Sequence, residues 1–122
     1  MQKQPLRYSF KYAFQGIGQF FLKDRNGKIH LFSSLMVILA GIYFQVSPAE
    51  WISLLLCFGL VIGFEMINHS IEKLADALHP GQSPFIKIVK DVAAAAVLWA
   101  AILSCITGLI IFLPKLYLLW QS

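Results

Sequence analysis

VAAAAVLWAAILSCITGLIIFL, residues 92–113, is a stretch of 22 residues without a single charged side chain. A helix needs about 20 predominantly apolar residues to cross the hydrocarbon core of a bilayer, so this stretch is long enough for one crossing. The whole chain has 122 residues, of which 58% are hydrophobic and 13% charged. A soluble domain of this size could not bury so much apolar surface. The composition also excludes a disordered chain, and the two cysteines are too few for a disulfide-stapled scaffold.

Two further apolar stretches precede this one. Residues 29–46 and 49–70 each approach the length of one crossing, the second only if Glu65 lies inside the span or at its edge. Helices satisfy their own backbone polar groups in lipid. We therefore expect an all-α membrane protein with transmembrane helices at about 29–46, 49–70 and 91–113, in a single domain covering residues 1–122.

The two connections between these spans differ in character. Ser47 is a favourable N-cap, Pro48 suits the first helical position and Glu50 suits the first turn, so a helix is expected to begin there. Residues 79–84, HPGQSP, are a dense run of helix breakers. Ser83-Pro84 at the end of this run predicts the start of another helix.

The basic residues predict the orientation. Six of the ten Lys and Arg residues precede the first span and three flank the second connection, which leaves Lys115 alone on the opposite side. The positive-inside rule then places the N-terminus and the second connection in the cytoplasm. Tyr117 and Trp120 are expected at the opposite membrane interface.

The segment before the first span carries an apolar stripe. Its residues follow helical spacing: Phe10, Phe14, Ile17 and Phe21. This pattern predicts an amphipathic helix over residues 8–22 that lies in the cytoplasmic interface. A basic topogenic leader is the alternative interpretation.

Polar residues follow one face of the second span and its extension. We call this set the polar stripe: Glu65, Asn68, Glu72 and Asp76. On a helix their spacing keeps them within roughly 80° of arc along about 16 Å. A carboxylate near hydrocarbon is costly, so Glu65 is expected to face protein or water and to act in transport, proton relay or catalysis. A structural hydrogen bond to another helix is the alternative.

The acidic residues suggest a cation site. Asp24, Glu72 and Asp76 could supply oxygen ligands to a hard cation such as Mg²⁺. Lys90 suits contact with a phosphate, although a flanking lysine that snorkels to the interface is the alternative. Asp91 could neutralise or position Lys90. Since the basic residues flank apolar spans, a membrane partner is expected and nucleic acid is not.

Residues 65–76, EMINHSIEKLAD, resemble the E-x-x-N-[ST]-A-I-E-x-x-x-D signature of the prokaryotic diacylglycerol kinase family, which includes undecaprenol kinases. Lys90-Asp91 is similar to the K-D pair of that family, which precedes a helix rich in small residues. Residues 24–30, DRNGKIH, resemble the E-R-N-x-R-I-H segment of its undecaprenol kinase branch. The resemblance covers roughly residues 7–113.

This resemblance implies a homotrimer in the bacterial cytoplasmic (inner) membrane, with three transmembrane helices and an N-terminal surface helix in each chain. It implies transfer of the γ-phosphoryl group of ATP, bound with Mg²⁺, to the hydroxyl of a membrane lipid at the cytoplasmic face. Undecaprenol is slightly favoured over diacylglycerol because of residues 24–30.

The resemblance also implies roles for single residues. Glu65 would be the general base, supported by Asn68, and Asp76 would help organise the polar stripe. Asp24 and Glu72 would hold the metal. The residues implied to bind ATP are Asp24, Glu72, Lys90, Asp91, Tyr12 and Arg7.

The chain departs from the family pattern at some positions. Asp24 stands where Glu is usual, which shortens the reach to a metal by one methylene group. Residues 81–83, GQS, replace the frequent E-Y-H, so contact between this loop and the nucleotide stays open.

Two other classes of function compete with the lipid kinase. A small oligomeric transporter could use Glu65 as a coupling carboxylate, and a non-catalytic membrane subunit would need no site. The polar stripe opens at one membrane face, where Lys90 and Asp91 join it, whereas a transport path should reach both faces. The sequence therefore favours the kinase.

Overall fold

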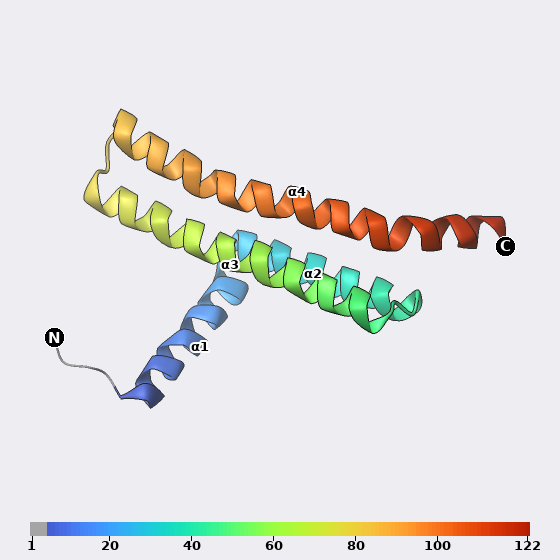
Figure 1. The fold of residues 1–122 in the computed structure, drawn as a ribbon. Coiled ribbons are helices and arrows are strands. Elements are labelled where there is room, and N and C mark those ends of the chain that lie inside the picture. The colour runs from blue at the N-terminus through green and yellow to red at the C-terminus, as the bar shows by residue number, and fades with distance from the viewer. Residues whose placement is uncertain (1–4) are drawn as a thin grey trace. The chain divides into compact units, whose positions relative to one another are not determined.

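The computed structural model describes residues 5–122, which form helices and contain no strand. In chain order the helices are α1 (Leu6–Lys23), α2 (Arg25–Tyr43), α3 (Pro48–Leu78) and α4 (Pro84–Gln121) (Figure 1). This confirms the all-α class. The chain divides into two compact units, one ending at Met36 and the other beginning at Val37, so α2 contributes to both.

In the first unit, α1 extends the predicted surface helix by two residues at its start and one at its end. Most of its side chains are exposed, including Phe10 and Phe14, whereas Phe20 is buried. A helix with exposed aromatic side chains suits a membrane interface. Its position in that interface remains a prediction.

Asp24 separates α1 from α2 and caps the start of α2. Its Oδ2 accepts a hydrogen bond from the backbone N–H of Gly27 at 3.3 Å, and its backbone carbonyl accepts one from Lys28 at 3.0 Å. Gly27 is buried against Phe20, where an added Cβ would lie 1.9 Å from the carbonyl oxygen of that residue. The junction therefore requires glycine at position 27, and Asp24 is a favourable N-cap.

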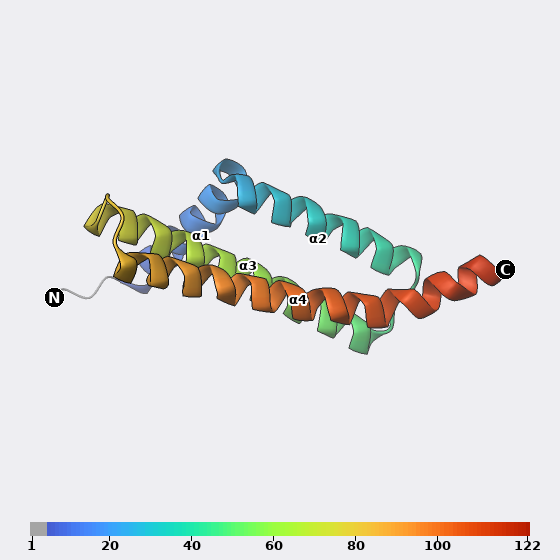
Figure 2. The same ribbon diagram turned by 90° about the horizontal axis from the view of Figure 1, so that it is seen from above.

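In the second unit, α3 and α4 lie side by side as an antiparallel pair (Figures 1 and 2). Three buried residues form the apolar core: Val46, Leu54 and Ile111. Aromatic and aliphatic side chains pack around it: Val37, Phe44, Trp51, Phe58 and Phe112. This core therefore lies toward the end of the pair that is opposite the connection between α3 and α4.

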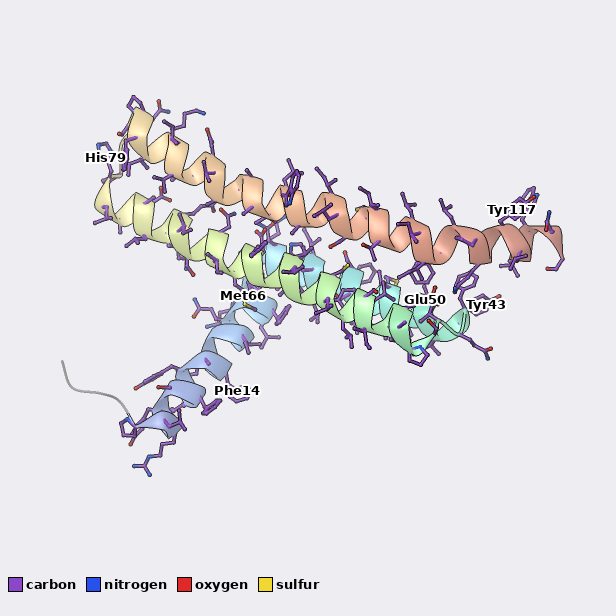
Figure 3. All side chains as sticks on the ribbon, viewed as in Figure 1. Phe14, Tyr43, Glu50, Met66, His79 and Tyr117 are labelled. Atoms are coloured by element: carbon purple, nitrogen blue, oxygen red, sulfur yellow. The ribbon has the colours of Figure 1, made fainter. Side chains whose placement is uncertain are left out.

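The start of α3 has the predicted cap. The Ser47 hydroxyl accepts from the Glu50 N–H at 3.2 Å, and the Glu50 carboxylate accepts from the Ser47 N–H at 2.9 Å. This reciprocal arrangement is a capping box. Glu50 also forms an ion pair of 3.0 Å with Lys115 of α4. Figure 3 shows Glu50, Tyr43 and Tyr117 at this end of the unit and His79 at the other.

Among the described residues, two helices, α3 and α4, are long and apolar enough to cross a membrane. They exceed the predicted spans, with 31 and 38 residues. In particular, α4 continues through Pro114 to Gln121, so the predicted interfacial tail is helical. Large apolar side chains on α4 are exposed, such as Trp99 at 67%, as expected for a surface that faces lipid or another helix. The span predicted at 29–46 remains a prediction.

Candidate active site

The polar stripe runs along α3 from a buried end to an exposed one. Glu65 and Asn68 are buried, with 6% and 8% of their surface exposed. Glu72 and Asp76, one and two turns further on, are exposed. Because α3 is one continuous helix over all four positions, the predicted alignment is present. The stripe therefore leads from a buried carboxylate to the connection between α3 and α4.

The carbonyl oxygen of the Asn68 side chain, Oδ1, is buried and accepts no hydrogen bond within the described part of the chain. Leaving such an acceptor unsatisfied costs about 1–3 kcal/mol. Native proteins rarely keep such a group without a reason, such as an external donor. A hydroxyl group is a donor of the required kind.

Lys90 on α4 reaches across to the stripe. Its ammonium group forms an ion pair with the carboxylate of Asp76 on α3. Asp91, which was expected to neutralise or position Lys90, pairs instead with Lys87 at 2.6 Å, one helical turn away. The pair of Lys90 and Asp76 joins two helices, so no local spacing predicts it. Lys87 and Asp91, in contrast, lie four residues apart on one helix, a spacing that is visible in the sequence.

A cavity of about 690 Å³ lies at the same end of the second unit. The connection and the first two turns of α4 line it: residues 80–84, Ile86, Lys87, Lys90 and Asp91. Residues 81–83 thus share a cavity with Lys90. Lys87 and the Asp91 carboxylate in this lining pair with each other, so the N-terminal end of α4, which carries partial positive charge, and Lys90 are the groups that favour an anion here.

The other predicted site residues belong to the first unit. Tyr12 and Arg7 are exposed on α1, and the Arg7 guanidinium lies 5.1 Å from the ring centroid of Tyr8. Asp24 is the N-cap of α2 described above. Among residues 5–122, no group of three or more His, Cys, Asp or Glu side chains is placed to hold a metal. The metal site predicted at Asp24 and Glu72 therefore stays a prediction.

Comparison with known proteins agrees with the resemblance. The sequence profile of the family described as "Prokaryotic diacylglycerol kinase" matches residues 11–112. An undecaprenol kinase of Bacillus subtilis (strain 168) is 37% identical over 108 residues, which cover 88% of each chain. A diacylglycerol kinase of Synechocystis sp. is 39% identical over 113 residues, which cover 91% of this chain and 64% of that protein.

An all-helical, strongly apolar chain with these relatives is a lipid kinase, a transferase of lipid metabolism that uses ATP as co-substrate. The profile match covers most of the chain. The chain belongs to the prokaryotic diacylglycerol kinase family.

Proposed function

We propose that this protein transfers the γ-phosphoryl group of ATP to the hydroxyl of a membrane lipid at the cytoplasmic face of the bacterial inner membrane. Undecaprenol is slightly favoured over diacylglycerol, since residues 24–30 resemble the undecaprenol kinase branch and a relative named undecaprenol kinase matches over 88% of both chains. The observation that carries the proposal is the buried carboxylate of Glu65 at the inner end of a polar stripe.

Glu65 would act as the general base. Its carboxylate accepts the proton of the lipid hydroxyl while the hydroxyl oxygen forms a bond to the γ-phosphorus and the bond from that phosphorus to ADP breaks. Asn68, one turn away on the same face of α3, would support Glu65, and its buried, unsatisfied Oδ1 would accept a hydrogen bond from an external donor. A base within an apolar helix lets the lipid keep its tails in the bilayer during the reaction.

Lys90 and Asp91 would bind the nucleotide from the cavity at the start of α4. A lysine ammonium binds phosphate oxygens as a point charge, so Lys90 would help to hold the phosphates of ATP. Tyr12 and Arg7 of α1 are proposed as further nucleotide contacts.

Asp24 and Glu72 would hold Mg²⁺. In proteins Mg²⁺ is usually bound by one or two carboxylates together with phosphate oxygens and water, so a pair of carboxylates suits it and a larger protein cluster is not required. When bound, the ion neutralises charge on the ATP phosphates. The Asp24 carboxylate would combine this role with its hydrogen bond to Gly27.

A homotrimer with three membrane spans per chain and a cytoplasmic N-terminus completes the proposal. Gly59 and Gly63, one turn apart on α3, have open space where a Cβ would lie. Small residues at this spacing let a second helix approach closely in a membrane. The exposed apolar side chains of α3 and α4 also support self-association of the chain in the membrane.

The test is a kinase assay in mixed micelles with MgATP and either undecaprenol or dioleoylglycerol. We expect lipid phosphate from the wild-type chain, with kcat at least about 100-fold lower for Glu65→Gln, because a general base contributes roughly 10²–10⁴-fold. Glu50→Gln is the matched control, since it makes the same change in the first turn of α3, far from Glu65 along the helix, and should keep the activity. No product from any lipid alcohol would contradict the proposal and favour a transporter.

A further inference from the structure

We infer that Asp76 is a positioning residue for the nucleotide, because its carboxylate holds the Lys90 ammonium beside the cavity at the start of α4. This inference rests on the proposed function, in which Lys90 contacts the phosphates of ATP. Asp76 would act through Lys90 and would not contact the reacting atoms.

The ion pair of Lys90 and Asp76 joins two helices. Asp76 lies near the end of α3 and Lys90 lies in the second turn of α4, so the pair bridges the connection between them. The Lys90 side chain is 37% exposed and lines the cavity. Its ammonium group is therefore held at a defined place relative to both α3 and the cavity.

The pair and a bound phosphate are compatible. A lysine ammonium has three N–H donors, of which Asp76 takes one. Two donors stay available for phosphate oxygens, so the nucleotide can bind without breaking the pair. Lysine otherwise loses much rotamer freedom when its ammonium group is ordered. Because Asp76 restricts that freedom before the nucleotide arrives, the nucleotide binds more tightly.

Repulsion between Asp76 and the phosphates is the opposing effect. The Asp76 side chain is 63% exposed, so water and salt screen its charge. The ordering of Lys90 is consequently expected to outweigh this repulsion.

Lys87 offers a matched comparison. It pairs with Asp91 on the same helix at 2.6 Å, and its side chain is 76% exposed. This pair fixes Lys87 relative to α4 alone and gives it no defined place relative to α3. The effect of replacing Asp76 should therefore depend on Lys90 and not on Lys87.

A double-mutant cycle tests the inference, with KM for MgATP and kcat measured in mixed micelles. Asp76→Asn should raise KM about three- to fivefold, the range expected for an exposed ion pair, and leave kcat within about twofold. Asp76→Glu should recover most of the loss. In the Lys90→Met background, Asp76→Asn should have no effect, whereas in the Lys87→Met background it should keep its full effect.

Three results would overturn the inference: an equal effect of Asp76→Asn with and without Lys90, a fall in KM, or a fall in kcat with KM unchanged. A Lys90→Met variant with wild-type KM would overturn it as well, while leaving the lipid kinase standing. If the wild-type chain made no lipid phosphate, the proposed function would fail. Calorimetric titration with MgATP would then decide the inference. Asp76→Asn must raise the dissociation constant of MgATP when Lys90 is present and must have no effect in the Lys90→Met background.

Discussion

At the scale of single residues, Asp24 and Gly27 show how a departure from the family pattern fits its surroundings. Asp is among the most favourable N-cap residues, whereas Glu is not, and the Asp24 carboxylate accepts the Gly27 N–H at the start of α2. The shorter acid therefore suits the junction between α1 and α2. Under the proposed function, the same carboxylate also serves the metal.

We expect Gly27→Ala to destabilise this junction. The added methyl group would meet the backbone of Phe20 at 1.9 Å, and backbone atoms cannot move aside as a flexible side chain can. Overpacking of this kind costs typically about 1–3 kcal/mol, which denaturation of the purified protein in detergent should reveal.

Gly18→Ala is the control for this prediction. No atom lies within 4 Å of the position its Cβ would take, and alanine is a better helix former than glycine by roughly 1 kcal/mol. Equal loss of stability in the two variants would contradict the close packing at Gly27.

At the scale of helices and connections, the turn after α2 contains a residue in an unfavourable conformation. Gln45 has a φ of 53°, the only positive value among the residues described. The Val46 N–H donates to the Gly41 carbonyl at 3.1 Å, which closes the helix end in the manner of a Schellman motif. Glycine is the residue that usually occupies this left-handed position.

We therefore expect Gln45→Gly to raise the free energy of unfolding by about 1 kcal/mol, since it relieves the left-handed strain of a side chain bearing a Cβ. Denaturant titration in detergent micelles measures the change. Gln45→Ala keeps the Cβ and serves as the control, because it should give no such gain. A stability loss in the glycine variant would contradict the interpretation of this turn.

At the scale of the whole molecule, the chain exposes far more apolar surface than a water-soluble protein would, and this surface includes the glycine pair on α3. Gly59→Leu combined with Gly63→Leu should therefore weaken the proposed homotrimer, and the Cβ atom added at either position has no neighbour within 4 Å in one chain. Light scattering of the protein in detergent would measure the loss of the larger species.

Ala77→Leu is the matched control for self-association. It adds apolar bulk at an exposed position near the end of α3, away from the glycine pair. If the double glycine variant assembled like the wild-type chain, Gly59 and Gly63 would lie outside the interface, and the small residues of α4 would become the next candidates.

The sequence alone determined those features that depend on local spacing. Apolar runs and cap residues predicted the helix starts at Pro48 and Pro84, and helical periodicity predicted the polar stripe on α3. Glu65 was singled out because a carboxylate in an apolar helix is costly wherever that helix lies. These inferences hold because helix geometry relates residues only a few positions apart.

Tertiary structure decided which side chains meet. The packing of α4 against α3 brought Lys90 to Asp76, and the close contact of Gly27 with Phe20 required the chain to turn sharply after α1. It also left the Asn68 carbonyl oxygen buried and unsatisfied in the described part of the chain. The physical reason is that such contacts join residues on different helices, whose relative rotation and register no local pattern contains.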